Sequence, residues 1–400
     1  MSVGIVGIVG KSVLNEATLP EVVAALAAAA SGHDADGSFP YEAFDLLWRH
    51  GVLDLVVPAG LGGGAAGLET AVRVLVDLGR GDPSVALVTA LHLLLHSQMA
   101  APGSVWPQVL RERLQRSVVD GPALANALRV EPELGTPARG GMPATVAERQ
   151  ADGSYRLRGR KIYSTGAPGL RWFVVYARTD DPEPLVGQFV VDATVAEEGG
   201  WRIEPTWNHL GMRATASHDV VFDGARVEAD AVVDLRPADA PAGYDPVLMA
   251  WNALLIAATY HGIALAARDW LADYLQRRVP SGLGKPLATL PRFQEAVGRI
   301  EAKVRTSTRL LADTARRIDE GVELVDACAD APVVKLTVTN NAIEAVTEAI
   351  ALVGNPGLSR DHDLERHLRN VLCSRIHTPQ DDMILVGAGR AALAEGTGGR

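Results

Sequence analysis

The chain has 400 residues, 48% of them hydrophobic and 22% charged, so it is long enough for two or three packed units with ordinary globular cores. Its formal net charge of −10 provides no basic field that would gather nucleic acid or an anionic membrane surface. The two cysteines, Cys328 and Cys373, are too few for a cysteine-based zinc site and suit a reducing compartment. We therefore expect a cytoplasmic protein without a metal.

The first 118 residues have the apolar periodicity of helices. The first helix opens at Leu19-Pro20-Glu21, where proline suits the first turn. Further helical segments are expected at 39–48, 68–78 and 83–99. These segments predict a helical N-terminal domain over residues 1–118.

From residue 119 to 235 the pattern changes to short β-branched runs separated by Gly, Asp and Pro. Such runs predict an antiparallel barrel or sandwich. The expected strands are 123–130, 143–149, 155–162, 171–178, 187–191, 201–205, 218–223 and 225–228. A linker rich in Pro, Ala and Asp should follow, around Pro237 and Pro241.

The remainder, residues 236–400, again has a helical pattern. Long helices are expected over 246–278, 290–318 and 331–353, with a last one from about residue 380, and short connections between long helices are typical of an up-down bundle. The apolar run 248–267 approaches membrane-spanning length, but it contains Asn252 and His261. We therefore interpret it as a buried bundle helix.

One polar turn stands out in the middle of the chain, Gly159 to Gly169, with the sequence GRKIYSTGAPG. A strand-like run enters it and another leaves it. Its glycines allow close backbone approach to a ligand, and its hydroxyls supply short donors and acceptors. By itself the turn fits either a site for a planar heterocycle or an ordinary hairpin connection.

Five short motifs occur in an order that resembles the acyl-CoA dehydrogenase superfamily. They are VEPELGT at 130–136, KIYSTG at 161–166, LGMRAT at 210–215 with VVF at 220–222, RVPSGLGKP at 278–286, and GNPG at 354–357. The resemblance implies an α+β protein with the acyl-CoA dehydrogenase fold: an N-terminal helical domain, a middle antiparallel β-barrel and a C-terminal four-helix bundle. It also implies a homodimer or homotetramer.

The resemblance implies a flavin between the β domain and the bundle, held largely by the polar turn. Thr165 matches a hydroxyl near flavin N5 and O4, and Arg278 matches a phosphate-binding residue that acts across a dimer interface. For Arg278, a helix C-terminal cation is an equally good interpretation. The full set of cofactor-binding candidates is Val130, Gly135, Thr136, Tyr163, Ser164, Thr165, Arg278 and Gly354.

The catalytic positions depart from the dehydrogenase pattern. A dehydrogenase needs a carboxylate base beside the flavin, and the family places it at one of two positions. These correspond here to Thr378 and Asn252, and neither side chain is a base near neutral pH. Four acids remain as conceivable substitutes, although pairing with nearby arginines is an equally simple role for them: Asp361, Glu365, Asp381 and Asp382.

The flavin-dependent monooxygenase branch of the superfamily resembles this chain where it departs from the dehydrogenases. Those enzymes act through a flavin C4a-hydroperoxide, and the dibenzothiophene type has a similar loop and a His-Asp-Pro segment, here His377-Thr378-Pro379. His92 matches a histidine that faces the flavin, and an imidazole can donate to a peroxide oxygen. The catalytic candidates are therefore His92, Ser164 and His377, although His92, like His96, could also be a core histidine.

Three functions remain open. The first is a monooxygenase that acts on a small organic substrate, with reduced flavin from a separate reductase. The second is an acyl-CoA dehydrogenase with a relocated base and an electron-transfer flavoprotein as partner. The third is a flavin-free homologue. Because the adenosine-binding motif lacks the family's aromatic and amide residues, FMN is as plausible a cofactor as FAD.

Overall fold

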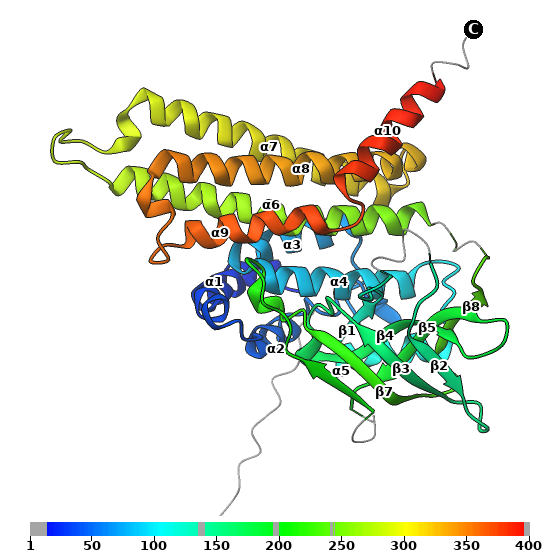
Figure 1. Ribbon diagram of the computed structural model, residues 1–400. Coiled ribbons are helices and arrows are strands. Elements are labelled where there is room, and N and C mark those ends of the chain that lie inside the picture. Colours follow the sequence, from blue (N-terminus) through cyan, green and yellow to red (C-terminus); the bar gives the residue numbers. More distant parts are fainter. Residues whose placement is uncertain (1–13, 135–140, 195–199, 241–242, 244, 396–400) are drawn as a thin grey trace, which may run out of the picture.

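The computed structural model describes residues 14–134, 141–194, 200–240, 243 and 245–395. A helical part, a β-sheet and a helical bundle follow one another along the chain (Figure 1). This is the predicted α+β organisation.

The N-terminal part contains α1 (Leu19–Asp36), α2 (Tyr41–Arg49), α3 (Leu68–Gly81), α4 (Pro83–Ala100) and α5 (Gln108–Asp120). All but α5 were predicted. Asp82 caps α4 by accepting from the backbone N–H groups of Ser84 and Val85, and Pro83 fits the first turn. Helix α4 is buried on almost every side because it lies between the bundle and the sheet (Figure 1).

The middle part is one eight-stranded sheet. Its strands are β1 (Leu124–Leu128), β2 (Val146–Arg149), β3 (Tyr155–Lys161), β4 (Leu170–Thr179), β5 (Leu185–Asp192), β6 (Trp201–Glu204), β7 (Asp219–Val227) and β8 (Val232–Pro237). The order is β6-β7-β3-β2-β4-β5-β8, with β1 also paired to β4.

Three details of the predicted sheet were wrong. The sheet is mixed, because β1 and β2 both run parallel to β4. The runs 218–223 and 225–228 form a single strand, β7, whose register shifts where it pairs with β3. Strand β8 was not predicted, and only its last residue, Pro237, falls in the predicted linker; β8 pairs antiparallel with β5 at the end of the sheet, where this proline is tolerated.

The bundle consists of α6 (Pro246–Arg277), α7 (Pro291–Glu320), α8 (Leu324–Val353) and α9 (Asp363–Leu372), and α10 (Asp381–Glu395) projects away from it (Figure 1). Helix α9 was not predicted. Helix α6 is the one helix in the described residues that is long and apolar enough to span a membrane, yet 72% of its most apolar window is buried inside the protein. It is the buried bundle helix that the sequence predicts.

Candidate functional site

Two of the recognised motifs meet through a buried ion pair. Lys161 at the end of β3 donates to Glu131 over 2.5 Å, and the two side chains are 0% and 2% exposed. Glu131 also accepts from the backbone N–H groups of Ala144 and Thr145 and from the Thr145 hydroxyl. Burial opposes ionisation of Glu131, but Lys161 and these donors outweigh it and lower the pKa of the carboxyl. The pair fixes the start of the polar turn.

Val130 and Tyr163 lie close in sequence to the two residues of this ion pair. The Val130 carbonyl accepts from the backbone N–H of Ile162, so the two predicted cofactor-binding segments lie side by side. Tyr163 adopts a left-handed backbone (φ 54°) and its side chain is 55% exposed. Its ring lies edge-on to Trp207 and His209, whose own rings stack 3.6 Å apart. A strained backbone that displays an aromatic ring is typical of a ligand site.

Thr165 begins a chain of buried hydroxyls. Its Oγ1 lies 3.0 Å from Ser217 Oγ, which lies 2.7 Å from Thr215 Oγ1, and Thr215 donates to the Met212 carbonyl at 2.8 Å. Asn126 holds the main chain of this turn by donating to the Thr165 carbonyl. These contacts fix the hydroxyl that the resemblance assigns to flavin N5 and O4.

The Ser164 hydroxyl is also buried, and it has no hydrogen-bond partner among the described residues. A buried hydroxyl without a partner costs free energy. A ligand atom that bonded it would remove that cost. Together with the exposed Tyr163 ring and the fixed Thr165 hydroxyl, it makes the turn fit a flavin.

The prediction that His92 donates a hydrogen bond to a flavin peroxide is wrong, because its ring has no free N–H. Its ring is fully buried; Nε2–H donates to the Leu53 carbonyl at 2.9 Å and Nδ1 accepts from the Ala125 N–H at 3.1 Å. Burial lowers its pKa to about 4, so the ring is neutral. Both nitrogens are occupied by the main chain, and His92 therefore anchors β1 to the N-terminal part. The neighbouring His96 is buried, its ring contacts that of His92, and its nitrogens have no hydrogen-bond partner among the described residues.

The segment His377-Thr378-Pro379 is held from two bundle helices. From α6, Tyr260 contacts His377 Nε2 through its hydroxyl at 2.7 Å, and Asn252 donates to the Thr378 carbonyl at 2.8 Å. From α8, the buried Lys335 donates to the carbonyls of His377 and Pro379 at 3.0 and 2.7 Å. The side chain of His377 is thus fixed in a half-buried position. Sequence reasoning missed Tyr260 and Lys335.

The two residues that the resemblance places at the family's base positions are in direct contact. Asn252 and Thr378 lie 126 residues apart in the sequence, and the Asn252 amide donates to the Thr378 carbonyl. Neither is a carboxylate. Of the four substitute acids, Glu365 pairs with Arg369, Asp361 bonds Ser359, and Asp381 accepts from Asn340.

The predicted phosphate-binding residue, Arg278, and the cofactor-binding candidate Gly354 lie at the C-terminal ends of two bundle helices. Arg278 follows α6 and is exposed, and its side chain makes no hydrogen bond or ion pair that the described residues supply. Gly354 ends α8 with φ 70° and open space around it. Both are free to meet a ligand or a second copy of the chain. Gly135 and Thr136 lie outside the described residues.

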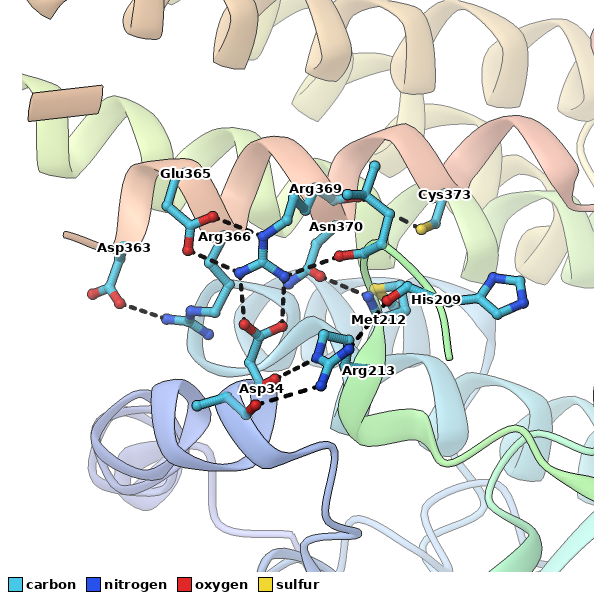
Figure 2. A network of polar contacts seen from close by, with 12 residues as sticks. Asp34, His209, Met212, Arg213, Asp363, Glu365, Arg366, Arg369, Asn370 and Cys373 are labelled. Atoms are coloured by element: carbon cyan, nitrogen blue, oxygen red, sulfur yellow. Dashed lines mark hydrogen bonds and ion pairs between the residues drawn. The ribbon is translucent and has the colours of Figure 1, made fainter. Parts of the chain in front are cut away.

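A polar cluster joins the three parts of the protein, and we call it the interdomain clasp: Asp34, Arg213, Glu365, Arg369 and Asn370 (Figure 2). Arg369 on α9 reaches Asp34 on α1 at 2.6 Å and Glu365 at 2.7 Å. Arg213 donates to the Asp34 carbonyl, and Asn370 accepts from the Met212 N–H.

The clasp requires close packing of main chains. A Cβ atom at Gly211 would lie 2.2 Å from the Arg369 carbonyl, so only glycine fits there. A cavity of about 300 Å³ opens beside the clasp, and its lining includes His209 and Leu210. Because α9 leads to His377 through the short helix η8 (Cys373–Ile376), the clasp ties the segment that carries this histidine to the β part.

Comparison with known proteins agrees with this arrangement. The acyl-CoA dehydrogenase N-terminal, middle and C-terminal domain models match residues 17–105, 130–225 and 254–381. A putative acyl-CoA dehydrogenase, YdbM of Bacillus subtilis, is 30% identical over 89% of this chain and 90% of its own length. The amino sugar nitrososynthase DnmZ of Streptomyces peucetius is 30% identical over 88% and 86%.

Solved structures share the fold. Butyryl-CoA dehydrogenase from Megasphaera elsdenii superposes with a TM-score of 0.81 at 21% identity, covering 98% of this chain and 100% of that one. FMN-bound TdsC from Paenibacillus sp. A11-2, a dibenzothiophene monooxygenase, gives 0.80 at 18%, covering 92% and 94%. With three domain models in order and relatives 30% identical over nearly the whole chain, this protein belongs to the acyl-CoA dehydrogenase family and is a flavin-dependent oxidoreductase.

Proposed function

We propose that this protein is a flavin-dependent monooxygenase that transfers one oxygen atom of O2 to a small organic substrate. The supporting observation is the contact between Asn252 and Thr378. The two positions that match the family's base thus carry an amide and a hydroxyl, and the adjacent His377 carries an imidazole. A site without a carboxylate base does not suit removal of an α-proton from an acyl thioester.

A bound flavin, reduced by a separate reductase, would supply the two electrons for oxygen transfer, with the second oxygen atom released as water. Tyr163, Ser164, Thr165 and the main chain at Val130 would hold the FMN or FAD ring. Arg278 and Gly354 would meet phosphates from a neighbouring copy in a homodimer or homotetramer. His377 would hold an oxygen atom at the substrate side.

Apolar packing behind this site would limit the access of water to it. Tyr260, Met212 and Leu87 pack in one buried cluster of the bundle, and the polar turn lies against α4, since a Cβ at Gly166 would touch Val88. Exclusion of water favours oxygen transfer over loss of peroxide. The similarity to DnmZ, an amino sugar nitrososynthase, makes an amine one substrate class to examine beside sulfur and aromatic compounds.

The test is to load the protein with FMN or FAD, reduce it anaerobically and mix it with oxygenated buffer in a stopped-flow spectrometer. We expect an absorbing transient that outlives the reoxidation of free flavin, followed by oxygenated product when an amine or sulfide is present. Reoxidation as fast as that of free flavin, with stoichiometric hydrogen peroxide and no product, would overturn the proposal. A protein that stays colourless and gains no melting temperature from flavin would instead support the flavin-free alternative.

A further inference from the structure

We propose that Tyr260 is a positioning residue that fixes His377 as its Nδ1–H tautomer, so that His377 presents a hydrogen-bond donor and not a base to the bound ligand. The identity of that ligand rests on the proposed function. The tautomer itself is a property of the flavin-free protein and can be measured without any ligand.

The contact between the two side chains leaves one arrangement of hydrogens that satisfies both. Tyr260 is 0% exposed, and its hydroxyl has one hydrogen-bond partner among the described residues, Nε2 of His377 at 2.7 Å. A phenol has a single hydrogen to donate. If Nε2 carried the proton and donated to the phenol oxygen, the phenol hydrogen would be buried without an acceptor.

Orphaning a buried donor is costly enough to favour the other arrangement by about tenfold or more. There, the Tyr260 O–H donates to the lone pair of Nε2, and the proton of the neutral imidazole sits on Nδ1. No hydrogen-bond partner of Nδ1 occurs among the described residues, and the side chain is half-buried. Nδ1–H is therefore the group that remains available to a ligand.

The surroundings keep both groups in these protonation states at neutral pH. Burial lowers the pKa of His377 to about 4, and the ammonium of Lys335 adds to this effect. Burial raises the pKa of Tyr260 well above its ordinary value, so the phenol keeps its hydrogen. The imidazole is neutral and its one lone pair is bonded to Tyr260.

This state has a direct consequence for the reaction. An imidazole whose free nitrogen is already protonated cannot remove a proton from a substrate, but it can donate to an oxygen atom. His377 therefore does not replace the base that Asn252 and Thr378 fail to provide. Its chemistry suits a site that holds an oxygen atom of the oxidant or of the substrate.

The test is a long-range ¹H–¹⁵N spectrum of the flavin-free full chain, labelled with ¹⁵N-histidine, at pH 7. The His377 signals are identified by their loss in His377→Gln. We expect a protonated Nδ1 and an unprotonated Nε2. The reverse pattern, or an imidazolium with both nitrogens protonated, would overturn the proposal.

Two variants distinguish positioning from simple packing. Tyr260→Phe removes only the hydroxyl and should give His377 signals averaged between the two tautomers. Tyr274→Phe is the matched control, since Tyr274 lies on the same helix and stacks on Trp270 away from His377; its spectrum should equal that of the wild type. An unchanged His377 tautomer in Tyr260→Phe would refute the role of Tyr260. None of these results depends on the reaction with oxygen, so failure of the proposed function would be seen separately.

Discussion

Replacing Lys161 by methionine should weaken the protein more than any surface substitution, because it leaves Glu131 charged and buried. The ammonium lies 2.5 Å from Glu131 and 2.5 Å from the Tyr176 carbonyl, and neither side chain of the pair is more than 2% exposed. Removal of one partner of a buried pair typically costs about 3–5 kcal/mol. The three donors from Ala144 and Thr145 remain, so we expect the lower end, about 3 kcal/mol.

The assay is urea unfolding followed by circular dichroism and tryptophan fluorescence, with flavin affinity measured in parallel. The double variant Lys161→Met/Glu131→Gln removes both charges and keeps an acceptor oxygen for most of the donors from Ala144 and Thr145. It should therefore recover about 1–2 kcal/mol of the stability lost in the single variant. Flavin affinity should fall in the single variant, because Lys161 lies in the polar turn. A single variant within about 0.5 kcal/mol of the wild type would refute this account of the pair.

Three further predictions concern acid stability, the missing base and the interdomain clasp. The pKa values of His92 and His261 lie at about 4 in the folded state, so the unfolded chain binds more protons than the folded chain between pH 6.5 and 4. The free energy of unfolding should therefore be highest above pH 6.5 and fall by about 2 kcal/mol per histidine at pH 5. Equal urea midpoints at pH 7 and pH 5 would contradict this. Thr378→Glu restores a carboxylate at the family's base position, so an acyl-CoA should bleach the flavin of this variant and not that of the wild type; unchanged spectra in both would show that the position is not beside the flavin. Arg369→Gln leaves Asp34 and Glu365 without their cation and should lower the free energy of unfolding in urea by about 2–4 kcal/mol. The control Arg360→Gln, at an exposed arginine, should change it by less than about 0.5 kcal/mol.

Much of the fold follows from local patterns that tertiary contacts did not override. The start of α4 at Asp82-Pro83 and the long apolar α6 are examples, since capping residues and unbroken helical periodicity define them. Strand β8 was missed because Asp234 and Pro237 are poor strand formers, and it exists through pairing with β5. Helix α9 was missed because its charged residues serve the clasp and not a solvent face.

The site residues that belong to a sequence motif could be predicted, whereas those defined only by tertiary contacts could not. The polar turn, Gly159 to Gly169, was identified by its residues and by the motif at 161–166. The sequence could not show that main-chain groups occupy both nitrogens of His92, because no pattern encodes a histidine's acceptors. Tyr260 lies 117 residues from His377; its only signal was a phenol in an apolar helix, which needs a partner when buried.

The proposed monooxygenase function depends most on the lack of a carboxylate at Asn252 and Thr378. The most direct measurement is the absorbance of the flavin band after anaerobic mixing of the flavin-loaded wild-type protein with saturated acyl-CoAs of short, medium and branched chains. We predict no bleaching with any of them. Bleaching within seconds by one acyl-CoA would contradict the account and make the protein an acyl-CoA dehydrogenase with its base elsewhere.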